Sequence, residues 1–289
     1  MKALIVVNAY IFNKSQISQA ERICEELTAL GADCEIKKNF NLSAIDGQKI
    51  TAERYDFCVY LDKDRVSARL LEGAGLRLFN SAAAIEVCDD KMLTNVALTK
   101  CGFPVPDATY APLCYNQGAT ADEKFLKNTA EFLRFPLVAK HNFGSLGSGV
   151  SLIESTEALT SYEQTNLHVP HFYQKFIDCG AGEDTRVIVI GGKVACAMKR
   201  RNESDFRSNI ELGGKGSKVE PDTRLISLCE DIARKLGLDY CGIDILTDKS
   251  GRRWVCEVNS NAFFAAAERV CGVNVAKLYA RHIIESLKS

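Results

Sequence analysis

Short apolar runs alternate with an amphipathic segment in the first third of the chain. Four runs are typical of buried strands: residues 3–7, 33–37, 57–61 and 77–79. A one-sided apolar pattern predicts a helix over residues 15–30, and Gly31 follows it at the position where glycine commonly ends a helix. Strands that alternate with helices predict a mainly parallel α/β sheet. No glycine fingerprint follows the first strand, which argues against a dinucleotide-binding motif.

The middle of the chain predicts a helix, a strand and a flexible loop. The helix begins at Asp89 or Asp90, either of which suits an N-cap, and continues to Gly102. Residues 136–140 form a strand-like run that ends in Lys140, and the glycine-rich stretch 144–149 follows it. Such a backbone can approach phosphates closely and present N–H donors. A flexible hairpin turn is the simpler interpretation of the stretch taken alone. A further helix is predicted near the C-terminus, over residues 274–287.

Two strand-like runs near the C-terminus, residues 241–246 and 254–259, flank a polar segment with the turn-forming pair Ser250-Gly251. In a hairpin symmetric about that pair, Asp244 lies directly opposite Glu257. Side chains alternate between the two faces of a strand, so Glu257 and Asn259 share a face. Three oxygen-bearing side chains on one face suit Mg²⁺ that is bound together with substrate phosphates. An ordinary solvated hairpin has the same spacing, and on spacing alone the two interpretations are equally supported.

The residues around this hairpin resemble a known family. The segments 199–201, 205–209 and 213–214, together with the two strands, resemble the ATP-grasp superfamily, and within it the RimK-like alpha-L-glutamate ligases. The resemblance implies an ATP-grasp fold, α/β with α+β lobes, behind an N-terminal parallel-sheet domain. The expected units are an N-terminal domain over residues 1–84, a small lobe with the glycine-rich loop over 85–173, and a large lobe with the metal site over 174–289.

The resemblance also implies roles for individual residues. The resemblance assigns nucleotide binding to Lys91, Lys140, Gly144, Ser145, Gly147, Gln174, Lys175, Phe176, Ile177, Asp184, Arg207 and Asn209. Arg186 and Arg207 match arginines near the phosphates or the activated carboxylate, and both are expected to be catalytic. Asp244, Glu257 and Asn259 are expected to bind the metal. Lys175 departs from the family, which often has an acidic residue there.

Two groups of residues keep alternative interpretations. Arg200 and Arg201 are part of the site or of a solvated basic run, with equal support. After Asn259, the chain has Ser260–Phe264 where the family commonly has a Pro-Gly loop that shapes the substrate pocket. Phe263 and Phe264 form an apolar wall for the substrate or pack in the core, and the core is slightly favoured because large aromatics are usually buried there.

The activity implied is that of an ATP-dependent carboxylate–amine ligase. A carboxylate attacks the γ-phosphate of ATP, and an amine then displaces phosphate from the acylphosphate to form an amide. We expect ATP and one or two Mg²⁺ ions, with Mn²⁺ as an alternative metal, and an amino acid such as glutamate as one substrate. The acceptor is a small molecule, a peptide or a protein. A non-catalytic ATP-binding regulator, or a ligase of the same fold with another carboxylate and amine, is the alternative.

Charge and cysteine spacing exclude several other classes. With 36 basic and 37 acidic residues, the chain has no excess charge for nonspecific binding to nucleic acid or an anionic membrane. No apolar run approaches the ~20 residues of a membrane helix. None of the 12 cysteines forms a C-x-x-C motif, so we expect reduced thiols and no structural zinc. A cytoplasmic protein is expected, and self-association into a homo-oligomer stays open.

Overall fold

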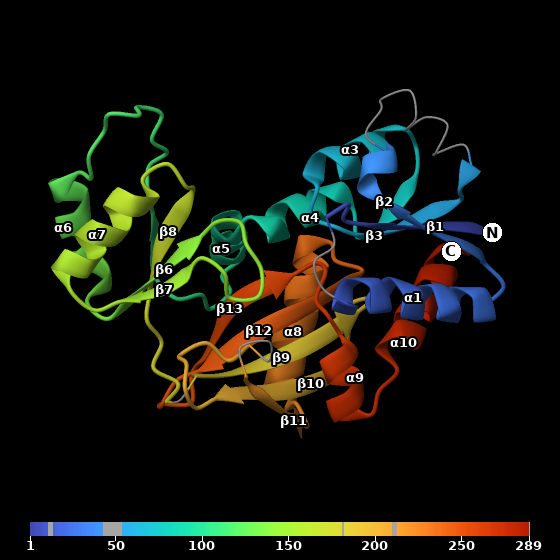
Figure 1. Cartoon of the computed structure of the whole chain (residues 1–289). Helices are drawn as coiled ribbons and strands as arrows, with labels where there is room; N and C mark the ends of the chain where they lie inside the picture. Colours follow the sequence, from blue (N-terminus) through green and yellow to red (C-terminus); the bar gives the residue numbers. More distant parts are fainter. Residues whose placement is uncertain (11–13, 43–53, 181, 210–212, 289) are drawn as a thin grey trace.

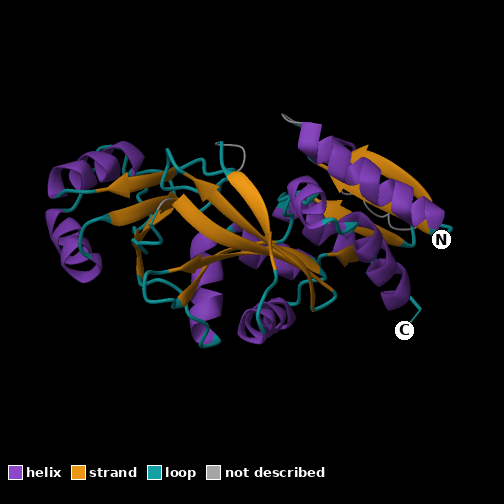
Figure 2. Ribbon diagram, turned by 90° about the horizontal axis from the view of Figure 1, so that it is seen from below, coloured by secondary structure: helices purple, strands orange, loops and turns teal. Residues whose placement is uncertain are grey.

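The computed structural model describes residues 1–10, 14–42, 54–180, 182–209 and 213–288. These residues form three β-sheets with helices packed against them. In Figure 1 the five-stranded sheet lies below the other two, with the sheet from the middle of the chain to the left and the N-terminal sheet to the upper right. Both chain ends lie on the side of the N-terminal sheet (Figures 1 and 2).

The N-terminal unit is a parallel sheet in the order β2-β1-β3-β4. Successive residues of β1 are buried on opposite sides: Ile5 packs in the cluster that contains α1, and Leu4 packs in the cluster that contains α3. Burial on both faces explains why this strand is a continuous apolar run. The elements of the unit are β1 (Lys2–Val7), α1 (Lys14–Ala29), β2 (Asp33–Lys38), η1 (Asn39–Leu42), β3 (Phe57–Leu61), α3 (Arg65–Gly73) and β4 (Arg77–Phe79).

Two helices, α4 (Ala82–Asp89) and α5 (Lys91–Lys100), lead from this unit into the small lobe. Asp90 caps α5, since its Oδ1 accepts hydrogen bonds from the backbone N–H groups of Met92 and Leu93. The small lobe is an antiparallel sheet in the order β5-β8-β6-β7. Its elements are β5 (Ala108–Tyr110), α6 (Glu123–Leu133), β6 (Leu137–His141), β7 (Val150–Ile153), α7 (Thr156–Asn166) and β8 (His171–Lys175).

The large lobe is an antiparallel sheet in the order β11-β10-β9-β12-β13. Both faces of the sheet are covered, since Ile188 of β9 packs in the cluster that contains α10 and Val187 packs in the cluster that contains α8. The elements of the lobe are β9 (Gly182–Ile190), β10 (Lys193–Asn202), β11 (Lys215–Val219), α8 (Thr223–Leu236), β12 (Tyr240–Thr247), β13 (Arg253–Asn259), α9 (Ala265–Cys271) and α10 (Val275–Ser286).

The N-terminal unit and the large lobe share one hydrophobic core. Ile23 and Leu27 of α1 belong to the same buried cluster as Tyr279 and Ile283 of α10. The side chain of Asn80 adds a polar link, because its Nδ2 donates to the backbone oxygens of Tyr240 and Ser260, each at 2.8 Å. This packing fixes the N-terminal strands relative to the β12–β13 hairpin.

The predicted strands and helices of the first third agree with the structure to within one residue at each end, and the parallel sheet is confirmed. Asp90, not Asp89, is the N-cap of α5. The sequence pattern did not predict helices α3 and α4. All twelve cysteines are free thiols. In the described ranges, no helix is both long and apolar enough to cross a membrane.

Candidate functional site

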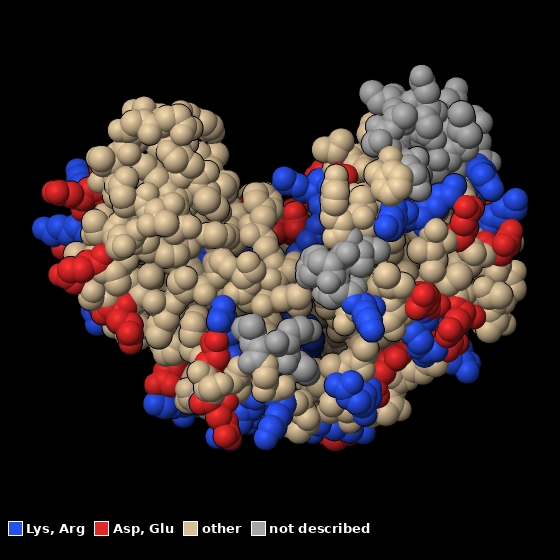
Figure 3. All heavy atoms as spheres, viewed as in Figure 1, with Lys and Arg blue, Asp and Glu red and all other residues tan. Residues whose placement is uncertain are grey.

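A cavity of about 380 Å³ lies where the two lobes and the N-terminal unit meet. Its walls come from the glycine-rich loop between β6 and β7, from the segment that joins β8 to β9, and from strands β9, β10, β12 and β13. In Figure 3 this side of the molecule is hollowed between the small lobe and the N-terminal unit, and both basic and acidic atoms line the hollow. Every site residue predicted from the sequence lines the cavity.

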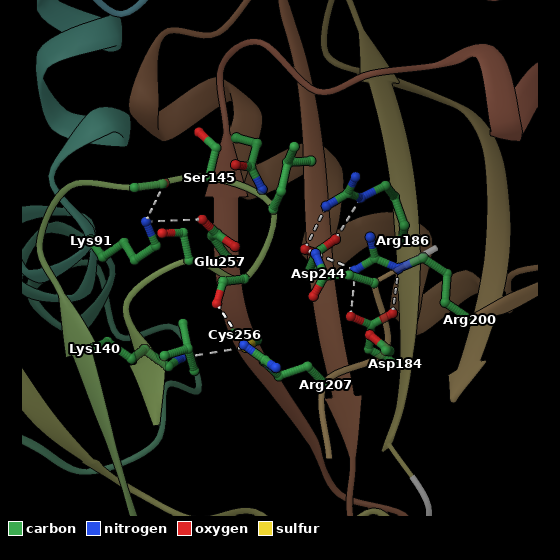
Figure 4. A pocket seen from close by; sticks show the side chains of 18 of the residues that line it. Lys91, Lys140, Ser145, Asp184, Arg186, Arg200, Arg207, Asp244, Cys256 and Glu257 are labelled. Atoms are coloured by element: carbon green, nitrogen blue, oxygen red, sulfur yellow. Dashed lines mark hydrogen bonds and ion pairs between the residues drawn. The ribbon is translucent and has the colours of Figure 1, made fainter. Parts of the chain in front are cut away.

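The β12–β13 hairpin pairs Asp244 with Glu257, as its turn predicts. This pairing does not arise from a hairpin that is symmetric about Ser250-Gly251. Next to the turn, Thr247 pairs with Arg253 and Ile245 with Val255, which places the centre of the hairpin at residue 250. A β-bulge at Cys256 then shifts the register by one residue and brings Glu257 opposite Asp244. Figure 4 shows the two carboxylates side by side on neighbouring strands.

A chain of four alternating charges lies in the floor of the cavity, and three of its members, Asp184, Arg200 and Asp244, are buried. Arg186 donates to both oxygens of Asp244, at 2.8 and 2.7 Å. Arg200 lies across from Asp184 on the neighbouring strand and donates to both of its oxygens, while its Nη2 also lies 3.0 Å from Oδ2 of Asp244. Burial raises the pKa of Asp244, but the two arginines outweigh it and hold this pKa at about 2. Asp244 is therefore ionised at neutral pH.

Three cations, Lys91, Lys140 and Arg207, also line the cavity (Figure 4). Lys91 Nζ donates to the backbone oxygen of Gly144 at 2.7 Å and lies 3.6 Å from Oε1 of Glu257. Lys140 Nζ donates to Oε1 of Gln174 at 2.7 Å. Arg207 Nη1 donates to the backbone oxygen of Gly147 at 2.9 Å. Lys91 and Arg207 thus bind the beginning and the middle of the glycine-rich loop. Burial lowers the pKa of Lys91.

Comparison with known proteins identifies the family. The model of the RimK-like ATP-grasp domain matches residues 88–284. The chain belongs to the RimK-like ATP-grasp family. The resemblance inferred from the sequence is confirmed, and so is the ATP-grasp fold.

Two curated relatives and one solved structure show the extent of the likeness. Human beta-citrylglutamate synthase B is 33% identical over 233 residues, which cover 80% of this chain and 59% of that protein. A Xanthomonas euvesicatoria protein named "Probable alpha-L-glutamate ligase" is 33% identical over 76% of this chain and 72% of its own length. The ATP complex of D-alanine–D-alanine ligase from Bacillus anthracis superposes with a TM-score of 0.76 at 20% identity, over 100% of this chain and 97% of that one. The chain spans just under three fifths of the human relative, and the structural likeness at this identity concerns the fold.

The structure separates the arginines that the sequence of this RimK-like chain leaves open. Arg200 is 3% exposed and belongs to the charge chain, whereas the side chain of Arg201 is 57% exposed and points to the outside. The two residues are neighbours on β10, so their side chains lie on opposite faces of the sheet. Strand alternation would have predicted that only one of them reaches the site.

Sequence reasoning missed the contribution of the N-terminal unit. Asn8, directly after β1, and Asp62 and Lys63, directly after β3, all line the cavity. Asp62 is buried and accepts hydrogen bonds from Nδ2 of Asn8 and Nδ2 of Asn39. The position of these residues directly after predicted parallel strands was the signal, because ligands of open parallel sheets bind outside the carboxyl ends of the strands.

The two phenylalanines after β13 have different environments. Phe264 is 2% exposed and packs edge-on against Tyr240, with ring centroids 6.3 Å apart. It is a core residue, so the slightly favoured core interpretation is confirmed for Phe264 and the alternative of a substrate wall is wrong. Phe263 is half-buried and lines the cavity.

The cavity of this RimK-like protein fits a nucleotide with Mg²⁺. Among the described lining residues, seven are Lys or Arg and five are Asp or Glu, which leaves an excess of positive charge for phosphates. Asp244 uses three of the roughly four lone-pair sites of a carboxylate in its arginine contacts, and one stays available for a metal. Asn259 Nδ2 is buried without a hydrogen-bond partner in the described part of the chain, as expected of an amide that faces a ligand.

Proposed function

We propose that this RimK-like protein is an ATP-dependent carboxylate–amine ligase that forms an amide bond through an acylphosphate. One observation carries the proposal. Cations from both lobes and two carboxylates on adjacent strands face each other across a single cavity beneath a glycine-rich loop. Phosphoryl transfer needs positioning and charge neutralisation rather than a protein nucleophile, and this arrangement supplies both.

In the first step, an oxygen of the substrate carboxylate bonds to the γ-phosphorus of ATP, and the bond from that phosphorus to the β,γ-bridging oxygen breaks to release ADP. Lys91, Lys140 and Arg207 line the cavity and offset the phosphate charge. In the second step, the amine attacks the acyl carbon, phosphate leaves and the amine loses a proton. Arg186 lies beside Asp244, where it would orient the carboxylate that is activated.

Asp244, Glu257 and Asn259 would hold one or two Mg²⁺ ions, which neutralise phosphate charge when bound. Arg186 and Arg200 fix the Asp244 carboxylate in place before the metal binds. The segment 174–177 would receive the adenine, because it joins the lobes and lines the cavity at the base of β8. Asp184 is held by Arg200, and in this proposal it orients that arginine.

The glycine-rich loop would keep water from the acylphosphate. Its backbone is adapted to a tight path, since Gly144, Gly147 and Gly149 all have positive φ. Lys91 and Arg207 already donate to carbonyl oxygens of Gly144 and Gly147 in the structure. These cations therefore position the loop close to where the phosphates would lie.

Glutamate is the amino acid that we propose as the amine substrate. The names of both the human and the Xanthomonas relatives contain glutamate. The loop after β13 lacks the Pro-Gly turn that the resemblance leads us to expect at the substrate pocket. The resemblance therefore says less about the identity of the carboxylate substrate than about the amine.

The experiment combines the protein with ATP, Mg²⁺ and a panel of carboxylic acids, first with hydroxylamine and then with glutamate. Hydroxylamine traps an acylphosphate as a hydroxamate, and the acid that yields it is the carboxylate substrate. ADP release that depends on both an acid and an amine supports the proposal. Absence of ADP release with every acid, from folded protein that binds ATP, would indicate a non-catalytic ATP-binding regulator instead.

A further inference from the structure

Asp62 is a buried side chain of the main cavity to which the proposed ligase mechanism gives no role. It follows β3 directly and is 7% exposed. Nδ2 of Asn8 lies 3.0 and 3.2 Å from its two carboxylate oxygens, and Nδ2 of Asn39 donates to Oδ2 at 2.6 Å. The backbone N–H of Lys63 donates to Oδ1 at 2.7 Å. Two amides and one backbone group therefore fix the orientation of this carboxylate in the cavity wall.

No cation pairs with Asp62 in the part of the chain that the structure describes. Nζ of the neighbouring Lys63 lies 3.5 Å from Oδ1 of Asp89 instead. Buried carboxylates are rarely left without a cation. Among the described residues, three donors occupy three of the roughly four lone-pair sites of Asp62, which leaves one for a ligand. The carboxylate is therefore suited to a group that brings both a positive charge and an N–H donor.

Asp62 lies toward the phosphate end of the main cavity. Nζ of the next residue, Lys63, contacts Asp89 at 3.5 Å. Lys91, two residues beyond Asp89, has its Nζ 3.6 Å from Oε1 of Glu257, a proposed metal ligand. Burial raises the pKa of Glu257, but nearby lysines, Lys91 and Lys63 among them, outweigh burial and lower it. The end of β3 is therefore on the side of the site where phosphate would leave the acylphosphate.

The second step of the proposed reaction needs a proton acceptor. The amine of an amino acid is an ammonium ion near neutral pH, and it must lose a proton before its nitrogen can attack. Burial and the charges of Asp64 and Asp89 raise the pKa of Asp62, although hydrogen bonds from Asn8 and Lys63 oppose the shift. Asp62 therefore takes up a proton more readily than an exposed aspartate, and before that its negative charge attracts the ammonium.

We propose that Asp62 binds the ammonium group of the amine substrate and accepts one of its protons. The proton passes to a carboxylate oxygen, the freed lone pair bonds to the acyl carbon, and the bond from that carbon to the phosphate oxygen breaks. The leaving phosphate takes the bonding electrons and the second proton that the nitrogen loses. This inference rests on the proposed ligase function and deepens it, because it places the amine subsite against the N-terminal unit.

Asp62→Asn tests this role when two nucleophiles are compared. Hydroxylamine is mostly uncharged near neutral pH, so the variant should form hydroxamate at a rate within about twofold of wild type. With the amino acid that gives the most product in wild type, kcat/KM for the amine should fall about 100-fold or more, because a general base contributes at least that factor. The KM for ATP should not change. Asp56→Asn is the matched control, since Asp56 is exposed at the opposite end of β3 and lies outside the main cavity.

The two nucleophiles separate the amine site from the ligase function. Equal loss of hydroxamate and amide in folded Asp62→Asn, or amide formation close to that of Asp56→Asn, would overturn the amine site and leave the ligase standing. Hydroxamate from wild type without amide from any amino acid would also contradict a site for their ammonium group. Absence of hydroxamate with every acid would count against the ligase instead.

Binding to wild type gives a readout that needs neither turnover nor a folded variant. The analogue α-hydroxyglutarate carries a hydroxyl group where glutamate has its ammonium, and its extra negative charge favours it in a cation-rich cavity. A larger rise in Tm with glutamate than with α-hydroxyglutarate would therefore report a site for ammonium. An equal or smaller rise would overturn the proposal, as would an advantage of glutamate that persists in folded Asp62→Asn.

Discussion

Nη2 of Arg200 lies 3.0 Å from Oδ2 of Asp244, and both side chains are buried. The contact joins β10 to β12 across the intervening strand β9. Arg200 thereby contacts a proposed metal ligand on a strand with which its own strand forms no backbone hydrogen bonds. The same guanidinium binds Asp184, so a single side chain pairs with two buried carboxylates.

Arg200→Ala should destabilise the protein by about 3–5 kcal/mol, because it leaves buried carboxylates without their cation. Arg201→Ala is the matched control on the next position of β10, and its effect should stay within about 0.5 kcal/mol because its side chain is exposed. Urea unfolding of both variants measures the difference. Equal stability of the two variants would show that the charge chain contributes little.

Glu257→Gln should fold as wild type and lose Mg²⁺-dependent ATP turnover by on the order of 100-fold or more, because a metal ligand loses its charge. Glu131→Gln on the exposed face of α6 is the control. ADP release is measured over a range of Mg²⁺ concentrations, with Tm as the check on folding. Turnover near the wild-type value in a folded Glu257→Gln protein would refute the metal assignment.

Lys140→Met should raise the KM for ATP roughly tenfold or more, since a hydrogen bond to a charged group is worth about 1.5–3 kcal/mol. Lys140 is buried in the cavity. Lys175→Met should change this KM less, because the Lys175 side chain is half-exposed at the edge of the cavity and lies 3.8 Å from Asp107. The departure of residue 175 from the family pattern then has a smaller consequence for nucleotide binding than the loss of Lys140. A larger effect from Lys175 than from Lys140 would reverse the assignment.

Glu163 in the small lobe should contribute a pH-dependent stability. Burial raises its pKa, but hydrogen bonds from His171 and Tyr173 outweigh burial and lower the pKa below 4.5. The folded-state pKa is thus below the unfolded one, so the contribution is present above pH 4.5 and is lost as the pH falls through the folded value. The stability difference between wild type and Glu163→Gln should shrink in that acidic range. A difference that is constant with pH would contradict the pKa shift.

Local pattern predicted much of this molecule. The continuous apolar runs of β1 and β3, the capped helix α5 and the hairpin around residue 250 follow from backbone and burial preferences of neighbouring residues. The facing pair Asp244 and Glu257 was also predicted, although the bulge at Cys256 that produces it was not. A bulge depends on the register between two paired strands, and the sequence of one strand alone does not determine that register.

Tertiary packing decided the rest. The sequence by itself determined the family, the elements named above and the polar site residues that the two lobes contribute to the main cavity, because these depend on residue type and spacing. Only the three-dimensional structure buried Arg200 between two aspartates and left Arg201 in solvent, and only it packed Phe264 against Tyr240 and left Phe263 in the cavity wall. The physical reason is that burial and charge pairing depend on which surface each side chain meets. Those surfaces come from elements as distant in the chain as α1 and α10.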